Sequence, residues 1–87
     1  MKIKYTDKFV KHFKQRIKPH LQLVLRFNQR ASLFLDSPRN PILNDHQLKG
    51  KKNDMRSFSI TGDIRVIYFI KDGDAYFVDI GSHNQVY

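Results

Sequence analysis

The spacing of hydrophobic residues changes along the chain from a helical period to a strand period. After a short alternating segment at Lys2–Tyr5, which predicts a half-buried strand, apolar residues recur every three or four positions. Thr6 offers an N-cap, so we expect a first helix over residues 7–18. Pro19 is tolerated at a helix start, and we expect a second helix to begin there and to end near residue 36. Two amphipathic helices joined by a tight turn predict an antiparallel helical hairpin.

From residue 55 onward, the apolar positions follow strand periods. Asp72-Gly73 is a strong signal for a two-residue hairpin turn, because both residue types accept the positive φ that such turns require. Gly62-Asp63 is expected to close the preceding hairpin. The expected strands are residues 57–60, 64–70 and 75–80.

Between the helices and these strands, residues 36–54 are rich in Pro, Asn, Asp, Gly and Lys. We interpret this segment as a loop that is too long to be only a connector. The order of elements predicts an α+β fold, with the helical hairpin packed on a mainly antiparallel four-stranded sheet. A length of 87 residues allows one small core, so we expect a single domain over residues 1–87.

The charge balance points to a polyanionic or acidic partner. Sixteen Lys and Arg residues stand against eight acidic residues, which gives a formal net charge of +8. Neutralising phosphates with such a surface releases counterions and gives sequence-independent affinity for nucleic acid. An acidic protein partner explains the same surface, and a run of charge is often only a solvated face.

The composition also narrows the cellular setting. The chain has no cysteine, so disulfides and thiolate zinc sites are excluded and a reducing compartment is compatible. No segment approaches the roughly 18 uncharged residues of a membrane span. We therefore expect a soluble, unprocessed, cytoplasmic protein.

Few residues offer chemistry, and the common enzyme motifs are absent. There is no phosphate-binding glycine loop, no paired His/Cys metal spacing and no nucleophile elbow. The C-terminal segment Gly81–Tyr87 carries an imidazole and a phenol four residues apart, directly after a hydrophobic strand. This pair suggests acid/base chemistry on a phosphodiester, because an unperturbed histidine exchanges protons near neutral pH.

Four segments together resemble the RelE/ParE superfamily of bacterial toxins. They are most similar to its YafQ-like branch of ribosome-dependent mRNA interferases. The segments are Asp45–Gly50, Met55-Arg56, Gly62–Tyr68 and Ile80–Tyr87.

The resemblance implies cleavage of mRNA in the ribosomal A site by attack of a ribose 2′-hydroxyl on the adjacent phosphate. It implies no metal and no cofactor, and it implies a cognate antitoxin protein as a further partner. The antitoxin would be expected to carry acidic segments that neutralise the basic surface.

The same resemblance implies roles for five residues. His83 matches the catalytic histidine of the C-terminal motif, and Arg65 matches a strand arginine that faces the scissile phosphate. Tyr87 matches a terminal aromatic residue, whose hydroxyl assists catalysis or whose ring stacks on a base. Asp63 matches an acidic turn residue that serves as a base or orients a histidine, although a plain turn aspartate fits as well. His46 matches a loop histidine of the same branch.

One position departs from the pattern, and a second group of residues suggests RNA contacts. Where YafQ-like enzymes place another histidine on the second strand, this chain has Ser59, which leaves the division between base and acid open. His12 and His20 lie outside the motifs and are expected at the surface. The expected RNA-backbone contacts are Lys49, Lys51, Lys52 and Arg56.

Two other functions remain as alternatives. A ParE-like gyrase inhibitor would share the fold but would be expected to lack the histidine and arginine set, so His83 with Arg65 argues against it. A non-catalytic nucleic-acid-binding module would use the basic helices alone, with a purely structural C-terminal motif.

Overall fold

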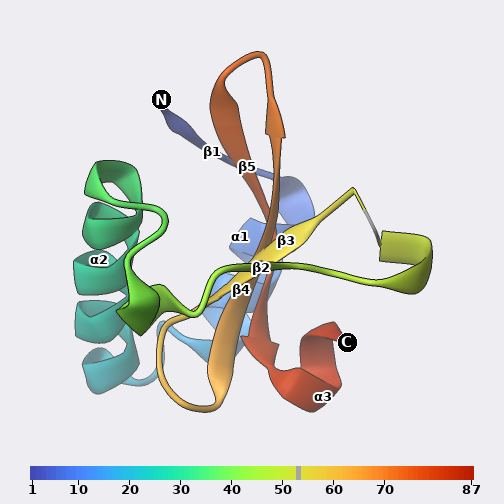
Figure 1. Cartoon of the computed structure of the whole chain (residues 1–87). Coiled ribbons are helices and arrows are strands. Elements are labelled where there is room, and N and C mark those ends of the chain that lie inside the picture. Colours follow the sequence, from blue (N-terminus) through green and yellow to red (C-terminus); the bar gives the residue numbers. More distant parts are fainter. Residues whose placement is uncertain (53) are drawn as a thin grey trace.

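The computed structural model describes residues 1–52 and 54–87, with the side chain of Lys51 outside the described part. A five-stranded sheet carries the strands in the order β1-β5-β4-β3-β2 (Figure 1). β1 is parallel to β5, and every other pair is antiparallel. The strands are β1 (Ile3–Tyr5), β2 (His46–Gln47), β3 (Arg56–Ser59), β4 (Ile64–Lys71) and β5 (Asp74–Ser82).

The α+β fold class is confirmed, but the prediction of four strands was wrong by one. The fifth strand, β2, lies inside the segment predicted as a loop, between the short 3₁₀ helices η1 (Pro41–Leu43) and η2 (Gly50–Lys52). His46 pairs with Ser57 and Gln47 with Arg56, so β2 is defined only by its pairing with β3. A two-residue strand has no period of its own, and its sequence therefore gave no signal.

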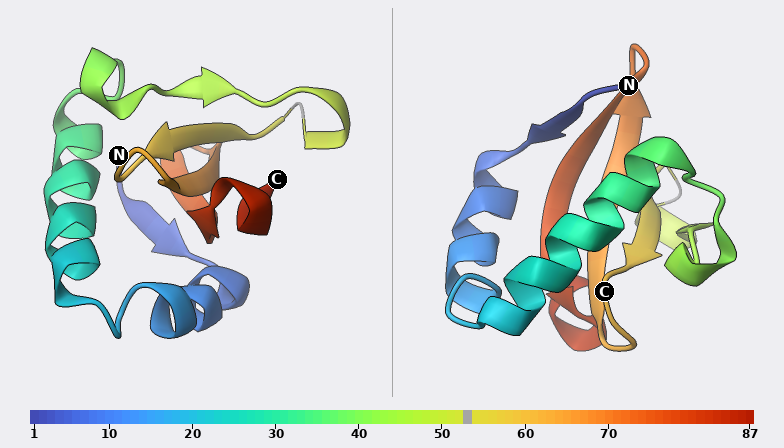
Figure 2. Two further views of the ribbon diagram at one scale, coloured as in Figure 1. Left: turned by 90° about the horizontal axis from the view of Figure 1, so that it is seen from below. Right: turned by 90° about the vertical axis from the view of Figure 1, so that its left-hand side faces the viewer.

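Helices α1 (Asp7–Arg16) and α2 (Leu21–Asp36) cover one face of the sheet, as predicted. The predicted cap is present, since Thr6 Oγ1 accepts a hydrogen bond from the Phe9 amide at 3.2 Å. The helix boundaries differ, because Pro19 lies in the turn and His20 is the N-cap of α2. Figure 2 shows that α2 returns across the sheet obliquely rather than lying alongside α1. No helix in the described part of the chain is both long and apolar enough to span a membrane.

The two faces of the sheet bury clusters of unequal size. The larger cluster lies under α1 and α2 and is centred on Phe77, whose ring lies within about 6 Å of rings from both helices and from β3 and β4. The smaller cluster lies on the opposite face and contains Leu48, Ile67 and Val86, with Met55 packed against it. The larger cluster supplies most of the apolar burial, which leaves the opposite face available for polar side chains.

The edge of β5 is covered by different elements before and after a β-bulge. Tyr68 pairs with Phe77 and Ile67 with Asp79, so one residue of β5 is extra at this point. Before the bulge, β1 pairs with the edge. After it, side chains of α1 take over: Arg16 donates to the Ile80 carbonyl at 3.0 Å, and His12 lies 2.6 Å from the Asp79 carboxylate. The edge is thereby protected from pairing with another chain.

Candidate active site

Strand register places several polar residues on the sheet face opposite α1 and α2. His46 pairs with Ser57, and Ser57 pairs with Ile67 of the smaller apolar cluster. Two residues further along β3, Ser59 pairs with Arg65. Directly paired residues present their side chains on the same face, and residues two apart on a strand do so too. His46, Arg65 and both serines therefore share the face that carries the smaller cluster.

The C-terminal segment forms a one-turn helix, α3 (His83–Val86), which packs on this face. Ser82 and Gln85 form a reciprocal capping box, in which the Ser82 amide donates to Gln85 Oε1 at 2.8 Å. The helix places His83 and Tyr87 on one side, with ring centroids 4.5 Å apart. Periodicity could not predict so short a helix, but the Ser-x-x-Gln spacing is a capping signal that could have found it.

Tyr87 is anchored at the centre of the face. Its hydroxyl donates a hydrogen bond to Ser57 Oγ at 2.6 Å, and Ser57 is fully buried. Lys52 donates from Nζ to the Val86 carbonyl at 2.7 Å, which ties the segment around η2 to the end of α3. A groove of about 400 Å³ lies between β2 and α3. Its lining residues are His46, Gln47, Leu48, Lys49, Lys52 and Tyr87.

His46 lies on β2 in this groove, not in a loop as predicted. Its Nδ1 is 2.9 Å from the Asn44 carbonyl oxygen. A carbonyl only accepts hydrogen bonds, so this contact assigns the proton of a neutral His46 ring to Nδ1 and leaves the lone pair on Nε2. The Nε2 atom can then accept a proton from a ligand in the groove.

Arg65 is hydrogen-bonded to Ser59, the position at which the resemblance implied a histidine. Its Nη1 donates to Ser59 Oγ at 3.1 Å, and its Nε is buried without a hydrogen-bond partner in the described structure. An arginine on a central strand with an unused buried donor is costly for stability, which favours a role in binding an anion. Ser59 thus serves this arginine instead of carrying a proton.

Asp63 lies apart from the groove. It is exposed in the turn between β3 and β4, where its amide donates to Thr61 Oγ1 at 3.2 Å. Its carboxylate has no bonded partner among the described side chains. The structure therefore does not bring Asp63 to the groove that His46 and Tyr87 line.

The predicted RNA contacts fall into different environments. Lys49 and Lys52 line the groove. The side chain of Lys51 lies outside the described part of the chain. The guanidinium of Arg56 is committed to the buried Asp45 carboxylate, with Nη2 at 2.6 Å and Nε at 2.7 Å, so its charge is already neutralised.

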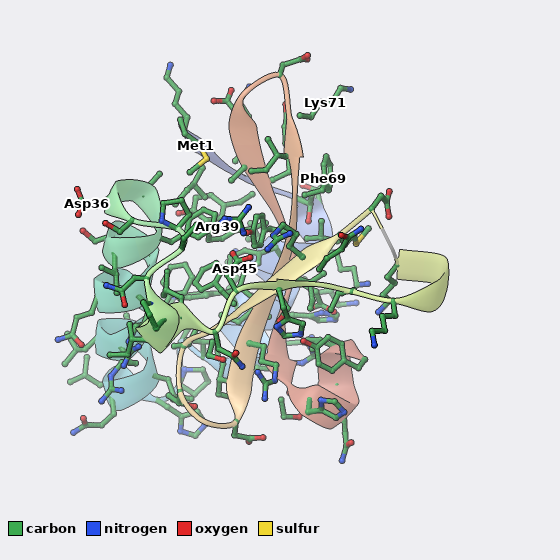
Figure 3. All side chains as sticks on the ribbon, viewed as in Figure 1. Met1, Asp36, Arg39, Asp45, Phe69 and Lys71 are labelled. Atoms are coloured by element: carbon green, nitrogen blue, oxygen red, sulfur yellow. The ribbon has the colours of Figure 1, made fainter. Side chains whose placement is uncertain are left out.

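Asp45 is the residue that the sequence analysis missed. Its side chain is only 1% exposed and accepts hydrogen bonds from Arg56, Arg39 and the Tyr68 hydroxyl. Figure 3 labels Asp45 and Arg39 among the side chains. Burial raises the pKa of the Tyr68 phenol and the Asp45 carboxylate raises it further, so the phenol stays protonated as a donor. This network fixes the segment between η1 and β2, immediately before His46.

No three His or Asp side chains of the described residues gather into a site that could hold a metal ion. The polar side chains on the sheet face opposite α1 and α2 that could take part in a reaction are histidines, an arginine, lysines and a phenol.

Comparison with known proteins decides the family. A family model described as "Bacterial toxin of type II toxin-antitoxin system, YafQ" matches residues 1–87. The chain belongs to this family. It is therefore a YafQ-family toxin of a type II toxin–antitoxin system. No curated protein sequence matches the chain.

Solved structures of bacterial toxins share this fold. YafQ from E. coli strain BL21(DE3) is 22% identical with a TM-score of 0.83, covering 98% of this chain and 96% of that one. E. coli YafQ in the DinJ–YafQ complex has a TM-score of 0.80 at 22% identity, with the same coverage. A metal-bound toxin from Helicobacter pylori is 28% identical with a TM-score of 0.77, covering 100% of this chain and 99% of that one.

Gly81 of this YafQ-family chain lies where side chains of α1 and α3 approach the backbone of β5. A methyl group there would lie 2.6 Å from Gln85 Oε1 and 2.8 Å from Arg16 Nη1. Both atoms end flexible side chains and would have to move, which strains the capping box of α3 and the bond from Arg16 to the Ile80 carbonyl.

We therefore expect Gly81→Ala to lower the free energy of unfolding by about 1–2 kcal/mol, as for other overpacked sites. Urea denaturation followed by circular dichroism measures the change. Gly62→Ala is the matched control, because nothing lies within 4 Å of a methyl group at that turn. Equal stability of the two variants would show that Gly81 does not limit the packing of α3.

Proposed function

We propose that this YafQ-family toxin is an endoribonuclease that cleaves mRNA on the ribosome, in the cytoplasm, without a metal ion. The observation that carries the proposal is the shared face of the sheet, where His46 and Tyr87 line a basic groove of about 400 Å³ and Arg65 lies on the same face through its pairing with Ser59. Aromatic rings and cations in one groove suit a single RNA strand, because bases stack on the rings and phosphates pair with the cations.

The proposed reaction is an attack of a ribose 2′-oxygen on the adjacent phosphorus. A base takes the proton of the 2′-hydroxyl as the new P–O bond forms. The bond from phosphorus to the 5′-oxygen then breaks, and that oxygen receives a proton from an acid. The products are a 2′,3′-cyclic phosphate and a free 5′-hydroxyl, so no outside nucleophile or oxidant is needed.

In this proposal one histidine acts as the base and another acts as the acid. His46 fits the base, since its Nδ1 contact with Asn44 leaves the Nε2 lone pair free. His83 is exposed on α3 beside the anchored Tyr87 and fits the acid for the leaving 5′-oxygen. A positioned acid or base commonly contributes about 10²- to 10⁴-fold to a rate.

Arg65 is the proposed partner of the phosphate itself. The phosphorane that forms during attack carries more negative charge than the substrate, and a fixed guanidinium stabilises that added charge. Ser59 holds the guanidinium in place through its contact at 3.1 Å.

Primer extension on mRNA from cells that express the chain tests the proposal. The wild-type chain is expected to give strong stops within reading frames, and His83→Ala is expected to weaken them by about 10²-fold or more. His20→Ala is the matched control, because His20 is an exposed histidine at the start of α2 whose side chain caps nothing.

Growth arrest without any mRNA cleavage by the wild-type chain would contradict the proposal and would favour the gyrase-inhibiting alternative. Cleavage that is unchanged in His83→Ala would contradict the catalytic assignment of α3.

The proposed partner of the toxin is a cognate antitoxin. The E. coli relative was solved as a DinJ–YafQ toxin–antitoxin complex. The net charge of +8 on this chain favours a partner whose contact surface is acidic.

A further inference from the structure

A second pocket, separate from the groove, lies between α2 and the hairpin of β3 and β4. Its volume is about 270 Å³. The turn of that hairpin, the side of α2, and Ile42 and Asn44 form its walls. Its polar lining residues are Arg26, Arg30, Asn44, Ser59, Thr61 and Arg65.

Three arginines line this small pocket. Arg26 and Arg30 are four residues apart on α2, and like charges at this spacing repel each other and destabilise a helix. Arg30 donates to the Ile42 carbonyl at 3.2 Å, whereas Arg26 has no bonded partner among the described residues. No acidic residue lines the pocket. Asp63 and Asp45 each directly follow a lining residue, but Asp63 is exposed in the turn and the Asp45 carboxylate is paired with Arg56. The cluster is therefore a site of uncompensated positive charge.

Several hydrogen-bond donors of the pocket are unused. Ser59 Oγ accepts from Arg65, and Thr61 Oγ1 accepts from the amides of Asp63 and Ile64 at 3.2 and 3.0 Å. Among the described residues neither hydroxyl donates, so each keeps its proton for a ligand. The Nε of Arg65 is likewise buried without a partner. A ligand that only accepts hydrogen bonds would satisfy both hydroxyl groups.

We propose that this pocket binds a backbone phosphate of the RNA strand, next to the phosphate that is cleaved. The inference rests on the proposed function, because Arg65 lines the pocket and is also the proposed partner of the scissile phosphate. A strand that runs from the groove past Arg65 reaches Arg26 and Arg30 with its neighbouring phosphate. The site fixes the position of the strand, and the arginines of α2 act as positioning residues.

The chemistry of the pocket favours a phosphodiester over an acidic peptide. Guanidinium groups match the tetrahedral oxygens of a phosphate with two donors each, and hydroxyl groups add further donors. Recognition of a peptide would instead depend on apolar anchor residues, and this lining is mainly cationic and polar.

Binding of a single-stranded 2′-O-methyl RNA tests the inference apart from catalysis, since such RNA cannot be cleaved by 2′-hydroxyl attack. Fluorescence anisotropy over a range of salt concentrations is measured for the wild-type chain and for Arg26→Gln/Arg30→Gln. Lys11→Gln/Lys14→Gln on α1 is the matched control, because it removes the same two charges from exposed positions.

Loss of the one phosphate held by Arg26 and Arg30 is expected to flatten the slope of log affinity against log salt by about 0.7 for a single strand. Between 50 and 200 mM salt, this change makes the affinity of the arginine variant fall about 2.6-fold less than that of the wild-type chain. The control is expected to keep the wild-type slope. Replacing single phosphates by uncharged methylphosphonates then locates the contact, since one replacement should weaken binding to the wild-type chain and not to the arginine variant.

An unchanged slope in the arginine variant would overturn the inference, whether or not the wild-type chain cleaves mRNA. If the arginine variant with the unchanged slope also lost binding of a polyglutamate peptide, the pocket would be assigned to an acidic protein instead. A flattened slope in a chain that cleaves nothing would uphold the phosphate site while the proposed nuclease function fails.

Discussion

Replacing Asp45 by alanine is expected to lower the free energy of unfolding by about 3 kcal/mol. The side chain of Asp45 is 1% exposed and accepts hydrogen bonds from Arg56, Arg39 and Tyr68. Its removal leaves the guanidinium of Arg56 and the buried Tyr68 hydroxyl without their acceptor, and breaking a buried pair by removing one partner is strongly destabilising. Arg39 contributes little to this loss, because its side chain is 72% exposed and its charge is screened by water.

Urea denaturation measures this effect, and two variants sharpen the result. Asp45→Asn keeps an acceptor but loses the charge, so we expect a smaller loss of stability. Asp54→Ala removes an exposed aspartate that has no bonded partner among the described residues, and we expect a change within about 0.5 kcal/mol. A loss below 1 kcal/mol in Asp45→Ala would show that the network does not stabilise the fold.

Replacing Arg65 by alanine is expected to slow mRNA cleavage by about 10²- to 10³-fold. The expected loss reflects the missing charge opposite the phosphorane, which develops only during the reaction. Arg65→Lys keeps the charge but cannot reproduce the fork of donors that Ser59 orients, so an intermediate rate is expected.

Single-turnover cleavage of ribosome-bound mRNA separates this effect from binding of the substrate. Lys71→Ala is the matched control, because Lys71 is an exposed cation at the far end of the same strand. Circular dichroism confirms that each variant is folded. A rate for Arg65→Ala within 3-fold of the wild type would remove Arg65 from the proposed mechanism.

The sequence predicted the elements that are long enough to show a hydrophobic period and missed the two-residue strand that is not. The two helices and the strands β3, β4 and β5 follow from periodicity and turn residues within short windows. β2 exists only because His46 and Gln47 pair with β3, and no local pattern encodes that pairing. The cap at Thr6 was predicted, but the start of α2 was misplaced, because Pro19 also fits a turn.

The candidate site was likewise predicted only in part. Residue types and the family resemblance singled out His46, Arg65, His83 and Tyr87, and the fold puts Tyr87 and His46 in one groove. The pairing of Tyr87 with Ser57 and the role of Asp45 could not be predicted, since both depend on which side chains become buried together. An aspartate in a polar segment looks like a surface residue until its partners are known.

The parallel pairing of β1 with β5 bears on when the toxin can form during synthesis. The Lys2 amide bonds to Asp74, 72 positions further along the chain, and the central strands β4 and β5 both come from the last third of the sequence. The first 52 residues contain α1 and α2 but none of the three strands against which these helices pack. Contacts over such separations form late, because long loops have to close first. A nascent chain therefore cannot assemble the sheet face that carries His46 and Arg65 until β3, β4 and β5 have been synthesised.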